Sequence, residues 1–278
     1  VYRRQSEIPN QIWQVDHTEL DIEVLAPGGA GVRPWLTVIL DECSRAVPGY
    51  TVGLGAPSAF GTSLALRPAI WTKADPDWPM CGIPEILYVD HGSDFTSEHL
   101  TQVAVDLKFQ SVYSAVARPQ GRGKIERFFR TVRSQLLSGF QGDTLDELNE
   151  TLDLWVSEQY HQRPHSSTGQ APFSRFTTHV ELIRTPPVDL EDHFRKEVRR
   201  RVTKDRTVSI DGRLYEAPTR FIGEQLSLLY HEHKPERVEI VHQGRSHGLL
   251  LPLDLTVNTT VQRDKPEQGM LPFGEGQP

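Results

Sequence analysis

Three acidic residues, Asp16, Asp90 and Glu126, stand at positions where carboxylates are suited to metal binding. Asp16 interrupts one apolar stretch and Asp90 ends another, and a buried carboxylate is costly unless a positive charge pairs with it. Glu126 follows in a basic stretch that is predicted to be helical. Three converging carboxylates suit hard divalent cations, which take oxygen ligands and leave positions open for water or phosphate. The sequence therefore predicts a metal-dependent site for phosphate chemistry.

The hydrophobic pattern predicts the elements that position these acids. Strands are expected at 11–25, 35–41, 46–54, 85–89 and 109–113, and helices at 58–73, 96–107, 121–140 and 145–159. Within the first strand, Asp16 has the parity of Ile12 and Leu20, so its carboxylate is expected on the apolar side. His17 is expected on the opposite side, in a packing role.

The three acids and their flanking motifs resemble the Asp-Asp-Glu transposase and retroviral-type integrase superfamily, most closely phage Mu transposase and TnsB-like bacterial transposases. The resemblance covers most of residues 11–176. It rests on the acids together with Arg118-Pro119-Gln120-Gly121, Gly123-Lys124-Ile125-Glu126-Arg127-Phe128-Phe129-Arg130 and Tyr160-His161-Gln162-Arg163-Pro164-His165-Ser166.

This resemblance implies an α/β fold: an RNase H-like catalytic core, with a five-stranded mixed sheet flanked by helices, followed by a small all-β barrel. In such a core the first strand is central and the fourth lies beside it, so Asp16 and Asp90 meet. The barrel also has local support, because strand-like runs surround Asp211-Gly212, a two-residue hairpin signal. We expect a linker from a preceding DNA-binding region at 1–10, the core at 11–176, a connector at 177–197, the barrel at 198–257 and a flexible tail at 258–278.

The implied activity is that of a DNA transposase. It would cut transposon 3′ ends with water and then join each 3′-hydroxyl to target DNA, without ATP in the chemical steps. Two Mg²⁺ ions, for which Mn²⁺ substitutes, would be held by Asp16, Asp90 and Glu126, with Asp16 as the bridging ligand.

The net charge of −7 does not favour a nucleic-acid binder, so the distribution of charge matters. Residues 118–133 hold six Lys or Arg against Glu126 alone, and residues 195–206 hold seven against two acids. These basic clusters are either DNA-binding surfaces or ordinary solvated faces. The DNA-binding candidates are Arg118, Gln120, Arg122, Lys124, Arg127, Arg130, Arg133, Arg199, Arg200 and Arg201, of which Lys124 and Arg130 are expected to flank the scissile phosphates.

The two cysteines, Cys43 and Cys81, lack the spacing of a metal site and favour a reduced, cytoplasmic setting. No apolar run has the roughly 18–20 residues that a membrane span needs. The chain opens with Val1, which indicates a fragment of a longer protein. The resemblance implies a bacterial, nucleoid-associated protein that forms a homo-oligomer on transposon-end and target DNA, with an ATPase partner for target selection.

Three other functions fit part of the pattern. A retroviral-type integrase shares the chemistry, although the Gly-Lys-Ile-Glu-Arg-Phe-Phe helix and the barrel favour a bacterial transposase. A ribonuclease H would usually add a fourth acid. A non-catalytic DNA-binding scaffold would keep the fold, but three intact acids argue against it. A nucleotide-binding P-loop is excluded, because Ile125 follows Gly121-Arg122-Gly123-Lys124.

Overall fold

The computed structural model describes residues 6–90, 98–113, 122–231 and 234–253 of the 278-residue chain. The chain divides into two compact units between Arg195 and Lys196. Unit 1 is built on a five-stranded sheet, and unit 2 contains two smaller sheets. Within the described ranges, no helix combines the length and the apolar character that crossing a membrane requires.

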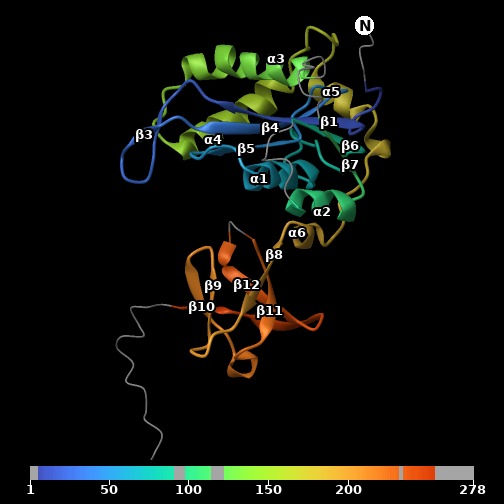
Figure 1. Cartoon of the computed structure of the whole chain (residues 1–278). Helices are drawn as coiled ribbons and strands as arrows, with labels where there is room; N and C mark the ends of the chain where they lie inside the picture. Colours follow the sequence, from blue (N-terminus) through green and yellow to red (C-terminus); the bar gives the residue numbers. More distant parts are fainter. Residues whose placement is uncertain (1–5, 91–97, 114–121, 232–233, 254–278) are drawn as a thin grey trace, which may run out of the picture. The chain divides into compact units, whose positions relative to one another are not determined.

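A mixed five-stranded sheet forms the centre of unit 1 (Figure 1). Its strands, in spatial order, are β5 (Gly49–Gly53), β4 (Trp35–Asp41), β1 (Ile12–Glu19), β6 (Ile86–Val89) and β7 (Gln110–Tyr113). β4 pairs antiparallel with β1 and β5, whereas β6 pairs parallel with β1 and β7. The expected α/β core is confirmed, with β1 central and β6 beside it.

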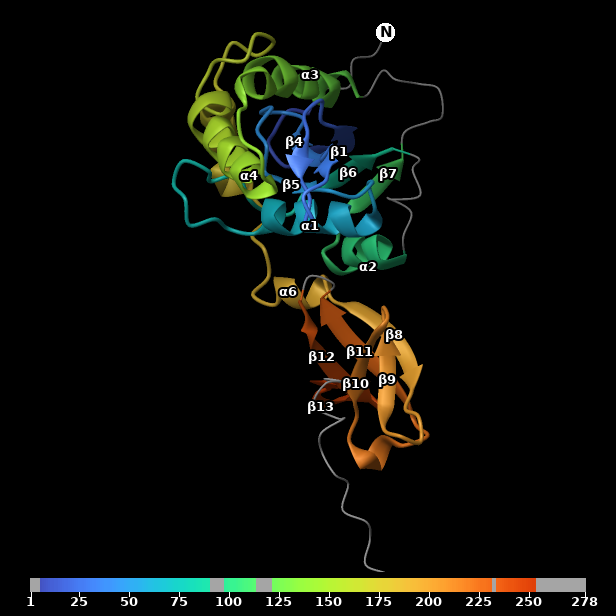
Figure 2. The same ribbon diagram turned by 90° about the vertical axis from the view of Figure 1, so that its left-hand side faces the viewer.

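Helices cover both faces of this sheet. They are α1 (Ala59–Ile70), α2 (Glu98–Asp106), α3 (Gly123–Thr131), α4 (Leu145–Leu154), α5 (Pro172–Thr177) and α6 (Leu190–His193). Side chains of α3 and α4 share one buried cluster, and side chains of α1 and α2 share another. Figure 2 shows the corresponding layers, with α3 on one side of the sheet and α1 and α2 on the other.

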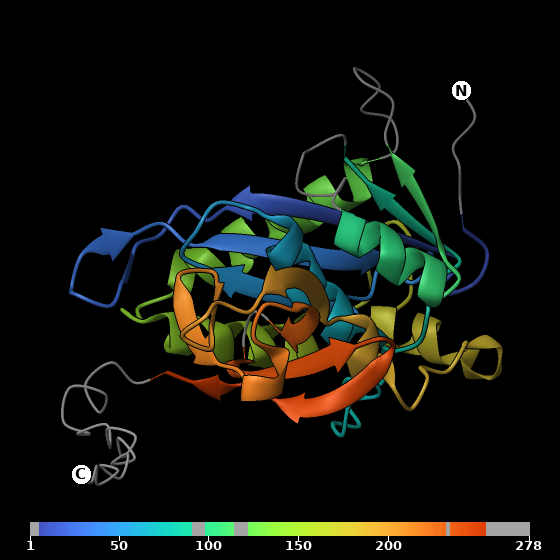
Figure 3. The same ribbon diagram turned by 60° about the horizontal axis from the view of Figure 1, so that its bottom comes forward.

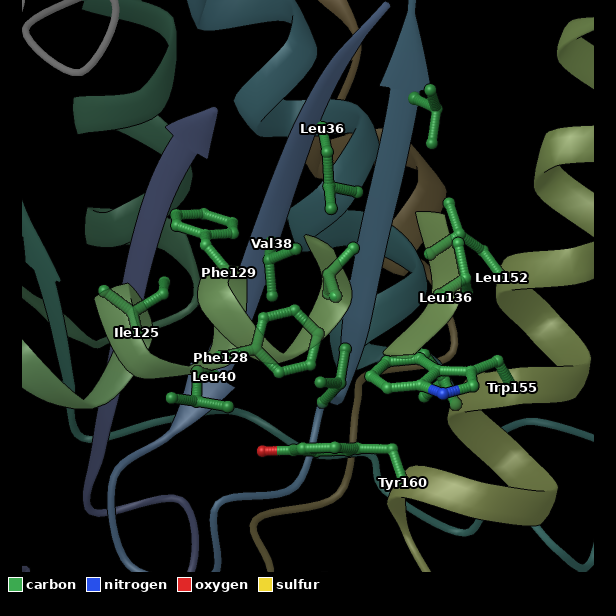
Figure 4. Packing of buried hydrophobic residues seen from close by; sticks show 14 of the residues in the cluster. Leu36, Val38, Leu40, Ile125, Phe128, Phe129, Leu136, Leu152, Trp155 and Tyr160 are labelled. Carbon is green, nitrogen blue, oxygen red and sulfur yellow. The ribbon is translucent and has the colours of Figure 1, made fainter. Parts of the chain in front are cut away.

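Alternation along β1 divides its side chains between these two clusters. Trp13 and Val15 are buried with residues of α1 and α2. Val38 of β4 and Phe128 of α3 belong to the cluster on the other face (Figure 4). Asp16 is paired with Val38 across the β1–β4 ladder, and directly opposed residues share a face of a sheet. Asp16 therefore lies on the face that α3 covers.

The long helices are less regular than their sequence period predicts. α3 passes into a π-helical segment, η3 (Val132–Leu136), and then into a 3₁₀ turn, η4 (Leu137–Gly139). α4 likewise continues as the π-helical η5 (Trp155–Tyr160). A π turn holds one more residue than an α turn and rotates everything after it, a shift that periodicity alone does not locate.

Two short strands, β2 (Val24–Leu25) and β3 (Gly31–Val32), form a hairpin apart from the main sheet. It appears in blue in Figures 1 and 3, projecting beyond the end of the sheet. The single strand expected at 11–25 is therefore two strands, because β1 leaves the ladder after Glu19. η6 (Val180–Leu182) and α6 are the last helical segments of unit 1.

Unit 2 is all-β, as expected, but its strands form two sheets. One contains β14 (Leu251–Pro252), β10 (Arg213–Glu216) and β9 (Thr207–Ile210); the other contains β13 (Arg245–Leu249), β12 (Lys234–His242), β11 (Gln225–His231) and β8 (Lys196–Arg201). They are the orange to red ribbons of Figure 3. Residues of both sheets, among them Val208, Tyr215, Leu228 and Ile240, share one buried core. A 3₁₀ turn, η7 (Thr219–Phe221), joins the sheets.

The predicted hairpin of unit 2 is confirmed. Asp211 and Gly212, with φ of 47° and 79°, connect β9 to β10. Positive φ at both central residues is the type I′ geometry that matches the twist of paired strands. β8 was not expected as a strand; it pairs antiparallel with β11 from Lys196 to Arg201.

Candidate active site

The parallel register of β1 and β6 brings the two aspartates to the same level of the sheet. Gln14 pairs with Tyr88, so two residues further along each strand Asp16 stands beside Asp90. Asp16 is buried within β1, whereas Asp90 comes directly after β6 and is half-exposed. The His17 backbone N–H donates to Asp16 Oδ1 over 2.9 Å, which restrains that carboxylate. Two acidic side chains thus meet where neighbouring strands end.

A single arginine bridges this pair. Arg122 Nη2 lies 2.5 Å from Asp16 Oδ1, and Arg122 Nη1 lies 2.5 Å from Asp90 Oδ2. The planar guanidinium offers separate donors to the two carboxylates, which is a strong, charge-assisted arrangement. Burial disfavours the charged guanidinium, but the two carboxylates outweigh this and raise the pKa of Arg122. The aspartates therefore sit around a positive charge.

Glu126 lies one helical turn beyond Arg122 on α3. Its backbone N–H donates to the Arg122 carbonyl over 3.1 Å, and its side chain is exposed. Residues four apart project from the same side of a helix, so Glu126 shares the side of α3 that carries the bridging arginine. Among the described residues, however, no three acidic, histidine or cysteine side chains form a metal-binding cluster. The structure brings together two of the three predicted ligands, and the role of Glu126 stays a prediction.

Packing fixes α3 over the sheet. Ile125, Phe128 and Phe129 are buried against strand residues such as Val38 (Figure 4). Each residue turns the helix by about 100°. Arg122 and Glu126 therefore lie along one edge of the stripe that these three buried residues form. The helix therefore presents its first turn to the aspartate pair.

Lys124 occupies the other edge of the stripe and is tied to the sheet. Its Nζ lies 2.5 Å from Glu42 Oε1, and Glu42 Oε2 accepts a hydrogen bond of 3.1 Å from Gln14 Nε2. Burial lowers the pKa of Lys124, an effect that Glu42 partly offsets. Lys124 thus fastens α3 to the end of β4, and its predicted contact with a scissile phosphate stays a prediction.

The other DNA-binding candidates of the core differ in their surroundings. Arg127 and Arg130 are exposed on α3. Arg133 is engaged with the end of β1, through Asp21 Oδ2 at 2.9 Å and Thr18 Oγ1 at 2.5 Å. Arg118 and Gln120 lie outside the described residues. Arg127 and Arg130 are therefore exposed cations of α3, close to the turn in which Arg122 is paired with the aspartates.

The basic cluster of unit 2 lies on β8. The side chains of Arg199, Arg200 and Arg201 are all exposed. Arg200 Nε donates to the Ser209 carbonyl over 3.0 Å, and Arg201 Nε donates to the Gly223 carbonyl over 2.9 Å. Arg199 Nε lies 3.8 Å from Glu197 Oε1, and the Arg199 side chain is 74% exposed. Their binding to DNA stays a prediction.

Sequence reasoning missed a buried polar group at the end of β4. Asp41 is completely buried and accepts hydrogen bonds from the backbone N–H of Asn10 and from both the N–H and the hydroxyl of Ser44. Burial raises its pKa to about 6, although these hydrogen bonds favour ionisation. The run of polar residues directly after an apolar strand, Asp41-Glu42-Cys43-Ser44-Arg45, was the available signal.

The motif beginning at Tyr160 anchors this same connection. His161 Nε2 accepts the Val47 N–H over 3.0 Å, and the Tyr160 hydroxyl donates to the Arg45 carbonyl over 2.9 Å. Burial, helped by Lys73, lowers the pKa of His161 to about 3, so the imidazole stays neutral and can accept. Tyr160 and His161 thus hydrogen-bond the end of η5 to the segment after β4.

His17 is placed as expected, away from Asp16. Its Nδ1 lies 2.8 Å from Thr37 Oγ1 on the neighbouring strand β4. The alternation of β1 sends it to the face opposite the aspartate pair. It belongs to the packing of the sheet.

Comparison with known proteins adds an independent finding. The model of the TnsB C-terminal domain matches residues 14–142, which contain all three acids, and the model of the Mu transposase C-terminal region matches residues 191–247. The transposase for transposon Tn552 of Staphylococcus aureus is 39% identical over 260 residues, covering 86% of this chain and 53% of that protein. This chain thus spans about half of that relative's length.

Two more distant similarities cover smaller parts of the chain. The Tn7 transposition protein TnsB of Escherichia coli is 26% identical over 117 residues, which are 38% of this chain and 16% of that protein. Among solved structures, the catalytic core domain of BIV integrase aligns with a TM-score of 0.42 and 16% identity, over 61% of this chain and 95% of that one.

Proposed function

We propose that this chain, a member of the Asp-Asp-Glu transposase and integrase superfamily, is the catalytic region of a DNA transposase. The observation that carries the proposal is the Asp16–Asp90 pair, set level by the β1–β6 register and already gathered around a cation. The 39% identity to the Tn552 transposase supports the choice of a transposase over the other members of the superfamily.

The donor set fits divalent metal. Asp16 and Asp90 present carboxylate oxygens on either side of one positive charge, and Mg²⁺ prefers oxygen ligands. We propose that Asp16, Asp90 and Glu126 hold two Mg²⁺ ions, with Mn²⁺ as a substitute. When bound, such ions offset the charge of a phosphodiester and favour an ionised attacking oxygen.

The proposed reaction is cleavage followed by joining. Water attacks the phosphorus at the transposon end, the P–O3′ bond breaks, and a 3′-hydroxyl is released. That hydroxyl then attacks a target phosphodiester, forming one P–O bond as another breaks. The exposed Arg127 and Arg130 on α3 are proposed to bind the DNA backbone beside the site, because phosphate contacts by Arg supply most sequence-independent affinity.

We also propose that the protein acts as a homo-oligomer on paired DNA ends and works with an ATPase that selects the target. The tail at 258–278, which we propose as the contact for that ATPase, lies outside the described residues. Deleting it from the full-length protein should reduce capture of that ATPase. Undiminished capture would remove the tail from the interaction.

Substitution of the acids tests the proposed catalysis. Asp16→Asn, Asp90→Asn and Glu126→Gln should each reduce joining of a pre-cut transposon end in Mn²⁺ to background, because each removes a proposed metal ligand without changing side-chain volume. Circular dichroism and urea unfolding verify that the variants are folded. Arg163→Gln, an exposed substitution in the turn after η5, is the matched control.

A folded variant that keeps full joining activity would remove its residue from the site. If all three acid variants kept the assembly of the DNA complex and the wild type itself joined no DNA, the non-catalytic scaffold would be the correct function.

A further inference from the structure

The arginine between the aspartates uses the oxygen atoms that a metal ion would need. Its two terminal nitrogens lie 2.5 Å from Asp16 Oδ1 and from Asp90 Oδ2. Divalent cations bind carboxylate oxygen at roughly 2.0–2.6 Å, so an ion between the two aspartates and the guanidinium would claim the same space. The two positive groups would also repel each other strongly at such a distance.

The arginine is well placed to move. Arg122 stands at the N-cap of α3, and its side chain makes no capping hydrogen bond to the helix. The helix itself is held by Ile125, Phe128 and Phe129 in the core and by the Lys124–Glu42 ion pair. Rotation of the Arg122 side chain therefore leaves the rest of α3 in place.

We infer that Arg122 is a tethered cation that competes with divalent metal for Asp16 and Asp90, and that it is released when metal binds. This inference rests on the proposed function and names a regulator of the same site. A released guanidinium is a forked donor suited to phosphate oxygens. DNA backbone therefore captures the freed arginine, and DNA and metal bind cooperatively, each increasing the affinity of the other by the same factor.

Direct metal binding tests the competition without any measure of activity. Mn²⁺ is titrated calorimetrically, in the absence of DNA, into the full chain carrying wild-type sequence, Arg122→Gln, Arg122→Lys or Arg163→Gln. Arg122→Gln should bind Mn²⁺ about tenfold more tightly, because it removes a charge-assisted competitor. Arg122→Lys, which keeps the charge but loses the fork, should fall between the two. Arg163→Gln, the charge-matched control in the exposed turn after η5, should bind as the wild type does.

Thermal unfolding gives a second readout. Without metal, Arg122→Gln should melt at a lower temperature than wild type, because its two carboxylates are no longer neutralised. Saturating Mn²⁺ should raise its Tm by more than it raises that of wild type. Equal Mn²⁺ affinities and equal Tm increases for wild type and Arg122→Gln would overturn the competition.

A duplex with the transposon end tests the coupling. Added DNA should increase the Mn²⁺ affinity of the wild type severalfold, and the increase should be much smaller for Arg122→Gln. An equal increase in both proteins would overturn the release onto phosphate.

Asp16→Asn separates this inference from the proposed function. If wild type binds Mn²⁺ and Asp16→Asn does not, the metal site stands whatever Arg122→Gln does. If neither wild type, Arg122→Gln nor Asp16→Asn binds Mn²⁺ with or without DNA, the metal site and the inference both fall.

Discussion

At the residue scale, the candidate site depends on carboxylates that are paired with neighbouring cations. Asp16 and Asp90 share the Arg122 guanidinium, and Glu42 shares Lys124. Each of these three carboxylates thus has a cation within ion-pair distance. This pairing offsets the cost of placing charged groups beside an apolar core, where an unpaired charge would be unfavourable.

His161 gives a pH dependence of known sign. Its pKa is lowered to about 3, whereas an unfolded histidine has the model value of 6.5. The unfolded state therefore takes up a proton first, and the stability supplied by neutral His161 is complete above pH 6.5 and is lost as the pH falls toward 3. Wild type should lose about 1–2 kcal/mol more than His161→Gln between pH 7 and pH 5. Urea unfolding at both pH values measures the difference.

Asp41 acts in the opposite sense, because its pKa is raised to about 6 and its folded form binds the proton first. It is present in both proteins, so its contribution cancels in the comparison of wild type with His161→Gln. Parallel pH profiles for the two proteins would show that His161 is not the group responsible.

At the element scale, α3 covers the aspartate pair and is fastened by its core residues and by Lys124. Its apolar residues enter the core, and Lys124 reaches the end of β4. The first turn of this helix is thereby set over the aspartates. The strength of that attachment should be visible in stability as well as in activity.

Lys124→Ala should lower the free energy of unfolding by about 2–3 kcal/mol, because it leaves the buried Glu42 with Gln14 as its hydrogen-bond partner and without the ammonium. Arg127→Ala, an exposed substitution on the same helix, should change it by less than about 0.5 kcal/mol. The measurement is urea unfolding of both variants at pH 7. Equal stabilities of the two variants would show that the ion pair does not hold α3.

Sequence reasoning located the elements of the core because their apolar periods are strong. The strand at 35–41 was placed without error, and the parity of Asp16 in the first strand was correct. The π turns after α3 and α4 were missed, since a one-residue insertion leaves the period almost unchanged over a few turns. β8 was missed because Lys196–Arg201 has a single apolar residue, Val198, and shows no alternation.

The site was predictable in part, because the strong apolar periods also located the ends of the strands. Strand ends indicated that Asp16 and Asp90 would meet, and the parallel register confirms it. The Arg122 bridge was not predicted, because the direction of a side chain at a helix start depends on the tertiary positions of both partners. The exposed direction of Glu126 was missed for that reason too.

At the scale of the whole molecule, the chain combines an acidic overall charge with local basic surfaces. The net charge is −7, yet β8 presents three consecutive arginines. If the protein binds DNA as proposed, such a distribution limits loose attraction to bulk DNA and leaves the affinity to a few defined contacts. The slope of log binding constant against log salt concentration then reports the number of phosphate contacts.

Arg199→Ala should reduce the steepness of the salt dependence of DNA binding by about 0.9 in log–log slope, the value for one lost phosphate contact. Its side chain is 74% exposed, so the loss of stability should be small. Arg206→Ala removes a charge from the same unit that is already paired with Glu216 at 2.6 Å, and should leave the slope unchanged. Equal slopes for Arg199→Ala and wild type would remove Arg199 from the DNA interface.

The decisive measurement is anomalous diffraction at the manganese edge from the full-length protein bound to a pre-cut transposon end. We predict manganese in contact with Asp16, Asp90 and Glu126, with the Arg122 guanidinium withdrawn from both aspartates and placed against DNA phosphate. Manganese elsewhere, or Glu126 still directed into solvent beside an Arg122 that continues to bridge the aspartates, would contradict it.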